Sequence, residues 1–284
     1  MLVSNDWKDY RLIDAGNGEK LESWGNVILR RPDPWALWTH EDTKEWNKYS
    51  AIYHRSEKGG GYWEKKKEIP EFWTINYKDL KFKVSPTGFK HTGLFPEQAV
   101  NWDIMSEKIK NAGREIRVLN LFAYTGGATV ACLKAGAHVT HVDSSRGMID
   151  WCKENVKSSK VDETKVRFLV DDCVKLVKRE IRRGNKYDAI IMDPPSYGKG
   201  ANGEIWSLEK DLYNLVNLVQ ELLSDNPICI MINSYSGLSP IILEDILKLT
   251  DQRNGHISSY EIGLKITNNN LILPAGITGI VEYE

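Results

Sequence analysis

The sequence of 284 residues has few cysteines, no long apolar run and almost no net charge. The cysteines (Cys132, Cys152, Cys173 and Cys229) are far apart and show no C-x-x-C spacing, which argues against a zinc site or a disulfide framework. No apolar run approaches the roughly 18–20 residues that span a bilayer. The N-terminal segment MLVSNDWKDY is unlike a secretory signal. We therefore expect a cytoplasmic globular protein with reduced thiols and no metal site.

The net charge of −1 gives no general attraction for nucleic acid. The charge is unevenly distributed, however, because residues 101–200 carry a net +5 and residues 201–284 a net −7. Basic residues are concentrated over 173–184 and in the Lys65-Lys66-Lys67 run. A basic helix of this kind can follow an RNA backbone. An ordinary solvated helix face is the more common explanation, and we expect it for both segments.

Tryptophan and turn residues set the first hundred residues apart. Seven of the ten tryptophans lie there, together with short apolar segments such as NVILR and LKFKV between glycines and prolines. Short strands between turn residues predict a small β-rich domain, which we place at residues 1–90. We predict that its tryptophans fill its core rather than form a base-stacking surface. Substrate recognition by this domain is a further hypothesis.

From residue 91 to residue 284 helices and strands alternate. Near-continuous apolar segments predict parallel strands buried on both faces, at residues 116–122, 138–143, 166–172 and 187–193. Further strands are predicted after Pro227, over 257–266 and over 276–284, and helices over 97–111, over 208–224 and from Ser239. Because no helix separates the last two strands, we expect an antiparallel strand at the sheet edge. The prediction is a doubly wound α/β domain with seven, mostly parallel strands.

Polar and glycine residues stand where three of these strands end. Asn120-Leu-Phe-Ala-Tyr-Thr-Gly-Gly127 closes the first strand, and a glycine pair there allows the backbone to approach a ligand. The second strand ends in Asp143, whose carboxylate can accept from both hydroxyls of a ribose. The third ends in Asp171-Asp172, placed to accept from an adenine amino group. Each feature alone has an ordinary explanation, such as a tight turn or a helix cap. In this order they predict a site for an adenosine-bearing cofactor.

NAD and S-adenosylmethionine are the two cofactors to compare. NAD requires a G-x-G-x-x-G loop that presents a helix N-terminus to the pyrophosphate. That loop is absent, since only Gly126 and Gly127 are present. S-adenosylmethionine has no phosphate and needs no such loop. The segment therefore favours S-adenosylmethionine and argues against a dehydrogenase.

The motif Asp193-Pro-Pro-Ser-Tyr197 directly follows the fourth strand. Two prolines stiffen the backbone and remove two N–H donors, which leaves carbonyls to face the cleft. Asp193 and the Pro194 carbonyl can hold an amino or amide donor, and Tyr197 can stack on a planar substrate. A plain Pro-Pro strand end is the alternative, but the position at the cofactor edge favours catalysis. Lys199 and Arg146 are suited to a substrate phosphate, although unspecialised surface charges explain them equally well.

The segments HTGLFPEQ (91–98), NLFAYTGG, HVTHVDSS and DPPSYGKG resemble class I S-adenosylmethionine-dependent methyltransferases. Within that class they are most similar to the branch of bacterial large-subunit ribosomal RNA methyltransferases, over about residues 85–284. The resemblance implies a Rossmann-like methyltransferase fold with an antiparallel last strand. It implies the following cofactor residues: Phe122, Ala123, Thr125, Gly126 and Gly127 for the methionine part, Asp143 and Ser144 for the ribose, Asp172 and Cys173 for the adenine, and Asp193 with Pro194 beside the methyl group.

Two departures from the family pattern concern the target atom. Cytosine-5 methylation needs a thiolate nucleophile, which the family places just after the fifth strand. This chain has Asn233-Ser-Tyr-Ser-Gly237 there, with Tyr235 in place of the cysteine, and neither Cys229 nor Cys173 matches. Enzymes that methylate amino groups place the aromatic residue directly after Pro-Pro, whereas Ser196 intervenes here.

We therefore expect methylation of RNA at an atom other than cytosine C5, and the resemblance implies that this RNA is ribosomal. A methyltransferase acting on a protein or small molecule is the first alternative. A non-catalytic S-adenosylmethionine-binding protein is the second.

Overall fold

The computed structural model describes residues 1–40, 44–56, 60–200, 203–235 and 238–284. Gly59, part of a predicted turn, and Ser236 and Gly237, after the predicted fifth strand, lie outside these ranges. The chain divides into two compact units. The sheet unit comprises Met1–Leu2, Val100–Ile262 and Ala275–Glu284, and the N-terminal unit comprises Val3–Ala99 with Gly263–Pro274.

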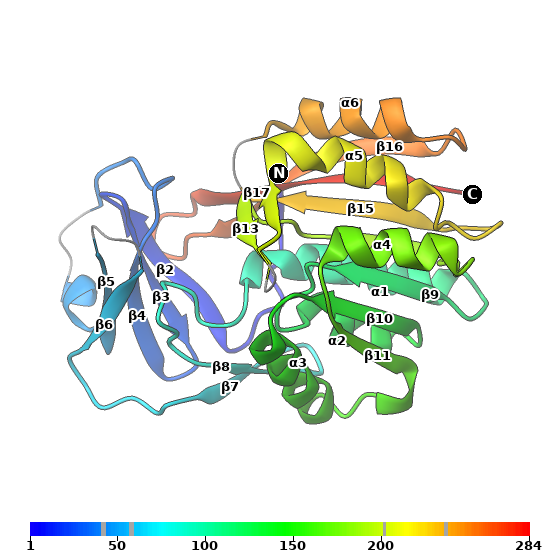
Figure 1. The fold of residues 1–284 in the computed structure, drawn as a ribbon. Coiled ribbons are helices and arrows are strands. Elements are labelled where there is room, and N and C mark those ends of the chain that lie inside the picture. Colours follow the sequence, from blue (N-terminus) through cyan, green and yellow to red (C-terminus); the bar gives the residue numbers. More distant parts are fainter. Residues whose placement is uncertain (41–43, 57–59, 201–202, 236–237) are drawn as a thin grey trace. The chain divides into compact units, whose positions relative to one another are not determined.

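The sheet unit is built on an eight-stranded sheet with the order β1-β16-β17-β15-β12-β9-β10-β11 (Figure 1). Its strands are β1 (Leu2–Val3), β9 (Arg117–Leu121), β10 (His138–Asp143), β11 (Val166–Val170), β12 (Ala189–Met192), β15 (Cys229–Ser234), β16 (His256–Lys265) and β17 (Ile272–Glu282). The strands from β15 to β11 pair in parallel, and β17 is antiparallel to β15. This confirms the predicted sheet, to which the two-residue β1 adds an eighth strand.

Helices cover both faces of this sheet, as a doubly wound fold requires (Figure 1). The helices are α1 (Ala99–Asn111), α2 (Gly127–Lys134), α3 (Arg146–Ser158), α4 (Cys173–Arg182), α5 (Leu208–Gln220) and α6 (Pro240–Thr250), with a short 3-10 turn at Glu163–Lys165. Helix α2 contacts α3, while α5 contacts α4 and α6. The apolar stripe predicted for residues 208–224 is buried in the core on the α4–α6 side. No helix in the described ranges is long and apolar enough to cross a membrane.

The N-terminal unit is rich in β structure, as predicted. A five-stranded sheet has the order β2-β3-β4-β5-β6, and β7 and β8 form a separate pair. The elements are β2 (Tyr10–Gly16), β3 (Glu19–Trp24), β4 (Val27–Pro32), β5 (Ala51–Arg55), β6 (Gly61–Lys65), β7 (Trp73–Tyr77) and β8 (Leu80–Val84), with 3-10 turns at Lys44–Asn47 and Pro96–Gln98. Trp24 and Trp46 are fully buried, and the indole of Trp46 donates to Asp14 Oδ2 at 2.8 Å. These two tryptophans pack the interior as predicted, whereas Trp35 is 45% exposed and the other four are only partly buried, so the prediction holds for part of the set.

A buried ion pair ties β3 to β4 in this unit. Arg31 Nε and Nη2 donate to the two carboxylate oxygens of Glu22 at 2.6 and 2.8 Å, and the Tyr10 hydroxyl donates to the same carboxylate at 2.8 Å. Burial alone raises the pKa of Glu22, but Arg31, Lys20 and these hydrogen bonds outweigh it and lower the pKa to about 2. The Glu22 carboxylate is fully hydrogen-bonded, and its pair with Arg31 therefore helps to fix the register of β3 against β4.

We expect Glu22→Gln to lower the free energy of unfolding by about 3–5 kcal/mol, because the substitution leaves the Arg31 guanidinium buried without its counter-charge. Glu19→Gln, which breaks the half-exposed pair with Arg30 on the same two strands, is the matched control. It should cost about 1 kcal/mol or less. Urea unfolding of both variants measures the difference, and equal losses would contradict the assignment.

The same carboxylate predicts a pH dependence. Its pKa is lower in the folded than in the unfolded chain, so its contribution to stability is complete above the unfolded value of 4.5. That contribution is lost as the pH falls from 4.5 toward 2. The decline in unfolding free energy over this range should be shallower in Glu22→Gln than in the wild type, measured by urea titrations at successive pH values.

Candidate functional site

The predicted site residues follow four neighbouring strands of the sheet unit. Three backbone hydrogen bonds join these strand ends: Ala123 N donates to Val142 O at 3.0 Å, Asp171 N to Asp143 O at 3.1 Å, and Asp193 N to Leu121 O at 3.4 Å. Because β9, β10, β11 and β12 are parallel, their carboxyl ends meet at one sheet edge. The structure therefore brings together the glycine turn and the three predicted carboxylates.

The turn between β9 and α2 has an unusual backbone. Phe122, Tyr124 and Gly126 have φ values of 54°, 51° and 85°. Left-handed conformations at non-glycine residues are uncommon and cost energy, and they occur often at ligand sites. In this turn every second residue has a left-handed conformation. The chain therefore coils tightly after β9 and enters α2 directly after Gly126.

Both glycines of the turn are required by the protein packed against them. A Cβ on Gly126 would lie 2.1 Å from Cys152 Sγ, and a Cβ on Gly127 would lie 2.5 Å from Trp102 Cζ2. The sequence reasoning assigned this glycine pair to the approach of a ligand. The structure shows an additional cause, namely close packing of the turn on α3 and α1, and the ligand approach stays a prediction.

A buried polar chain that the sequence reasoning missed lies beside the turn. Asn120 Nδ2 donates to Thr129 Oγ1 at 3.0 Å, and Thr129 Oγ1 lies 2.8 Å from His141 Nδ1. Burial lowers the pKa of His141 to about 3, so its ring is neutral. This chain links β9, α2 and β10 beneath the turn.

The carboxylate of Asp143 holds the turn between β9 and α2 in place through hydrogen bonds. Its Oδ2 accepts from Tyr124 N at 2.9 Å and its Oδ1 from Ser145 N at 2.8 Å. Burial raises the pKa of Asp143, while these two bonds oppose the shift. Each carboxylate oxygen retains capacity to accept a further hydrogen bond. Ser144, the second predicted ribose residue, is exposed.

Asp172 and Cys173 begin α4. Asp172 is the N-cap, and its Oδ1 accepts from Lys175 N at 2.8 Å. Its Oδ2 makes no hydrogen bond to the described residues and is the atom left to accept from an amino group. Cys173 is buried, and its Sγ accepts from Phe122 N at 3.3 Å. The thiol therefore holds the turn in place, and burial raises its pKa far above the usual range.

Asp193 is oriented by a residue that sequence reasoning did not select. Asn233 Nδ2 donates to Asp193 Oδ1 at 2.8 Å, and Asn233 Oδ1 accepts from Thr278 at 3.2 Å. Burial raises the pKa of Asp193, and the bond from Asn233 opposes that shift. Asn233 is the first residue of the segment that lacks the cysteine of cytosine-5 enzymes. We named this segment from the sequence but did not predict a hydrogen bond from Asn233 to Asp193. Pro194, next to Asp193, is buried.

The segment after Pro-Pro forms a hairpin, β13 (Tyr197–Lys199) paired with β14 (Ile205–Ser207), which was not predicted. Trp206 Nε1 donates to Pro195 O at 2.7 Å, and its ring centroid lies 5.0 Å from that of Phe122. The expectation that both proline carbonyls face the cleft is therefore wrong for Pro195, whose carbonyl is already bonded. Tyr197 is 56% exposed.

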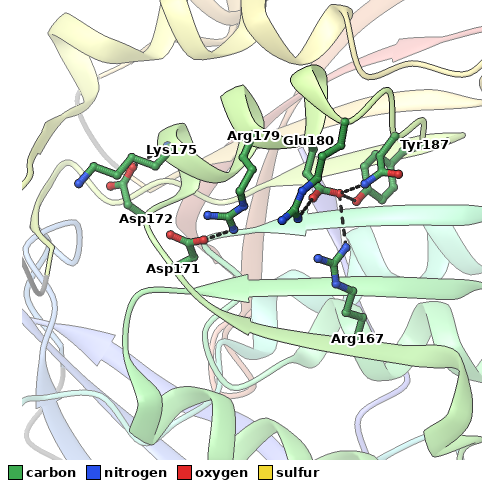
Figure 2. Close-up of polar contacts among 9 residues, drawn as sticks. Arg167, Asp171, Asp172, Lys175, Arg179, Glu180 and Tyr187 are labelled. Atoms are coloured by element: carbon green, nitrogen blue, oxygen red, sulfur yellow. Dashed lines mark hydrogen bonds and ion pairs between the residues drawn. The ribbon is translucent and has the colours of Figure 1, made fainter.

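Some basic residues of helix α4 and of the residue that follows it pair with acidic residues of their own unit (Figure 2). Lys175 pairs with Glu204. Arg179 pairs with Asp171, as Figure 2 shows. The buried Glu180 pairs with Arg167 and Arg183, and accepts from the Tyr187 hydroxyl at 2.7 Å. Lys178 and Arg182 are exposed and make no ion pair with the described residues, so the expectation of an ordinary solvated helix face stays a prediction.

Residues 46–252 match the family model of S-adenosylmethionine-dependent methyltransferases. The chain belongs to this family. It is 33% identical over 197 residues to a ribosomal RNA large subunit methyltransferase K/L of Shewanella frigidimarina, which covers 69% of this chain but 25% of that protein. The methyltransferase therefore spans about a quarter of the length of such curated relatives.

Two solved structures resemble the methyltransferase over nearly its whole length. A S-adenosylmethionine-dependent methyltransferase from Agrobacterium tumefaciens has a TM-score of 0.94 and 33% identity, covering 100% of this chain and 93% of its own. A putative methyltransferase from Streptococcus mutans has a TM-score of 0.77 and 18% identity, covering 98% and 76%, and so supports the fold. These matches confirm the predicted family, fold class and cofactor.

The hydrogen-bond acceptors of the site fit S-adenosylmethionine. Asp143 and Asp172 keep free acceptor capacity, suited to ribose hydroxyls and an adenine amino group. The turn before α2 coils tightly and is bonded to Asp143 and Cys173, so it differs from a dinucleotide loop with three spaced glycines. The contacts of individual residues with the cofactor remain predictions.

We expect Gly126→Ala to abolish measurable binding of S-adenosylmethionine and to destabilise the methyltransferase by about 2 kcal/mol or more, because the new methyl group meets Cys152 in a left-handed backbone. Cys152→Ala in the same chain removes the contacting sulfur and should restore part of the stability. Gly147→Ala, in the first turn of α3, is the control, because its Cβ would make only an ordinary contact with Ser145 Oγ at 3.8 Å. Calorimetry of cofactor binding and thermal unfolding report both effects, and full binding by Gly126→Ala would refute the packing argument.

Proposed function

We propose that this protein transfers a methyl group from S-adenosylmethionine to RNA, at an atom other than cytosine C5. The observation that carries this proposal is the Asp193 carboxylate, held by Asn233 at the same sheet edge as the glycine turn and Asp143. The similarity to a protein named as a ribosomal RNA methyltransferase supports RNA as the acceptor class.

We further propose which residues hold the cofactor. The turn residues Phe122, Ala123, Thr125, Gly126 and Gly127 surround its methionine part, Asp143 and Ser144 bind the ribose, and Asp172 binds the adenine amino group. The position of Cys173 against Phe122 N gives it an indirect part, since it supports the turn. Thr125 is buried and its carbonyl accepts from Asn155 at 2.9 Å, which supports a backbone rather than a side-chain role.

The sulfonium of the bound cofactor is itself a good leaving group, so the chain needs to supply orientation rather than a covalent intermediate. In this proposal Asp193 Oδ2 accepts a hydrogen bond from the acceptor's amino or amide group. Asn233 keeps the carboxylate in place through Oδ1. The Pro194 carbonyl limits where the acceptor can lie, and the exposed ring of Tyr197 stacks on it.

Cytosine C5 chemistry is disfavoured by the positions of the thiols. Cys229 is buried in β15 with its sulfur 3.5 Å from Met105, and Cys173 supports the turn. Burial raises the pKa of each thiol, which opposes formation of the thiolate nucleophile. All four cysteines are free and buried, a pattern in keeping with our proposal that the reaction takes place in the reducing cytoplasm.

We expect Asp193→Asn to lower methyl transfer by about 100-fold or more, since it replaces the acceptor oxygen by an amide, while cofactor affinity stays within about threefold. Asp150→Asn, on the exposed surface of α3, is the control and should transfer normally. The assay uses tritiated S-adenosylmethionine and total RNA from a strain that lacks the protein. Unchanged methyl transfer by Asp193→Asn, or a loss of transfer that is explained by an equal loss of cofactor affinity, would overturn the role of Asp193. Label in the protein or small-molecule fraction alone would replace RNA as the acceptor.

A further inference from the structure

The N-terminal unit contains a hollow of about 530 Å³, which we call the N-terminal groove. Its lining comes from residues 4–12, the β3–β4 turn and residues 264–270. The last of these segments runs beside β2, because Leu12 and Ile266 form a parallel bridge and Thr267 N donates to Leu12 O at 2.9 Å. Chain ends about 250 residues apart in sequence therefore build one groove.

Three cations line the groove without neutralisation. Lys8, Arg11 and Lys265 are exposed and make no ion pair with the described residues. The carboxylate among the lining residues belongs to Asp9, whose Oδ2 already accepts from Asn76 N at 2.8 Å and Asn76 Nδ2 at 2.6 Å. The groove is therefore positive, whereas on helix α4 the side chains of Lys175 and Arg179 are paired with carboxylates.

The groove also has an aromatic and amide lining. Trp7 and Tyr10 lie with ring centroids 5.8 Å apart, and the Trp7 indole N–H is already bonded to Pro96 O at 3.0 Å. The partly exposed Trp7 ring thus offers apolar surface. Asn5 and Asn26 are exposed at the groove and supply amide donors and acceptors.

We propose that the N-terminal groove binds a single-stranded segment of the substrate RNA, with phosphates at Lys8, Arg11 and Lys265 and a base against Trp7. Positive charge combined with an aromatic wall and amide groups is how proteins hold unpaired nucleotides. A cavity of this size suits a nucleotide-sized group. The inference rests on the proposed function for its RNA, but concerns a separate part of the chain.

The test uses the full chain with Lys8→Gln, Arg11→Gln and Lys265→Gln combined. All three side chains are exposed, so the fold should be retained, as thermal unfolding can verify. The probe is a fluorescein-labelled oligouridylate of about 12 nucleotides, followed by anisotropy over a range of salt concentrations. We expect a dissociation constant raised about tenfold at 0.1 M salt, and a salt slope reduced by about 2, because three phosphate contacts are lost. Affinity for S-adenosylmethionine should not change.

The matched control removes three charges from the sheet unit: Lys157→Gln, Lys178→Gln and Arg182→Gln. These residues are also exposed and without ion pairs among the described residues. The control should keep the wild-type dissociation constant to within about twofold. Equal effects of the two triple variants would show general charge attraction and overturn the groove.

Further outcomes separate this inference from the proposed function. If the wild type methylates RNA but the groove variant binds the oligonucleotide normally, the groove assignment is wrong and the function stands. If an oligoaspartate peptide displaces the RNA at lower concentration than unlabelled oligouridylate, the groove serves an acidic protein partner instead. If inorganic phosphate displaces the labelled RNA at the same concentration as unlabelled oligouridylate, the groove is a phosphate site and the RNA assignment is wrong. If the wild type does not bind the oligonucleotide, the RNA-binding role of the groove is wrong. The proposed methyl transfer is tested separately by the tritium assay.

Discussion

The site depends on one constraint, the coiled turn that joins β9 to α2. Its left-handed residues are held in place because Asp143 accepts from Tyr124 N and Cys173 accepts from Phe122 N. Each bond comes from a different strand or helix, so the turn is defined only when the sheet is assembled. Strain at such a turn persists where the surrounding structure determines it from several sides. The same bonds leave acceptor capacity on Asp143 at the edge where a cofactor is expected.

The polar side chains of this edge have double roles. Asp172 caps α4, and Asp193 is held by Asn233, yet each has one carboxylate oxygen without a bond to the described residues. Fixing one oxygen restricts the rotation of the carboxylate and so aims the other. Preorganisation of this kind reduces the entropy that binding has to overcome. On the sequence alone, we treated a helix cap and a ligand-binding residue as alternatives. In this structure the helix-cap role and the proposed ligand role are compatible.

Charge is also divided between two uses. On α4 the basic side chains stabilise the fold, since Glu180 and Asp171 bind Arg183 and Arg179. In the N-terminal groove the cations have no such partners, although that part of the sequence carries almost no net charge. The local density of basic residues in the sequence does not show which of them are paired, because it does not show which carboxylates fold against them.

The sequence by itself determined the order and type of the main elements in residues 91–284, since buried parallel strands and amphipathic helices have distinct apolar periods. It also determined the family, through motifs that follow the strands. Tertiary structure alone decided the packing reason for Gly126, the role of Asn233 and the hairpin that occupies the Pro195 carbonyl. It alone placed residues 263–274 beside β2. These features arise from contacts between residues distant in the chain, which periodicity and local motifs do not encode.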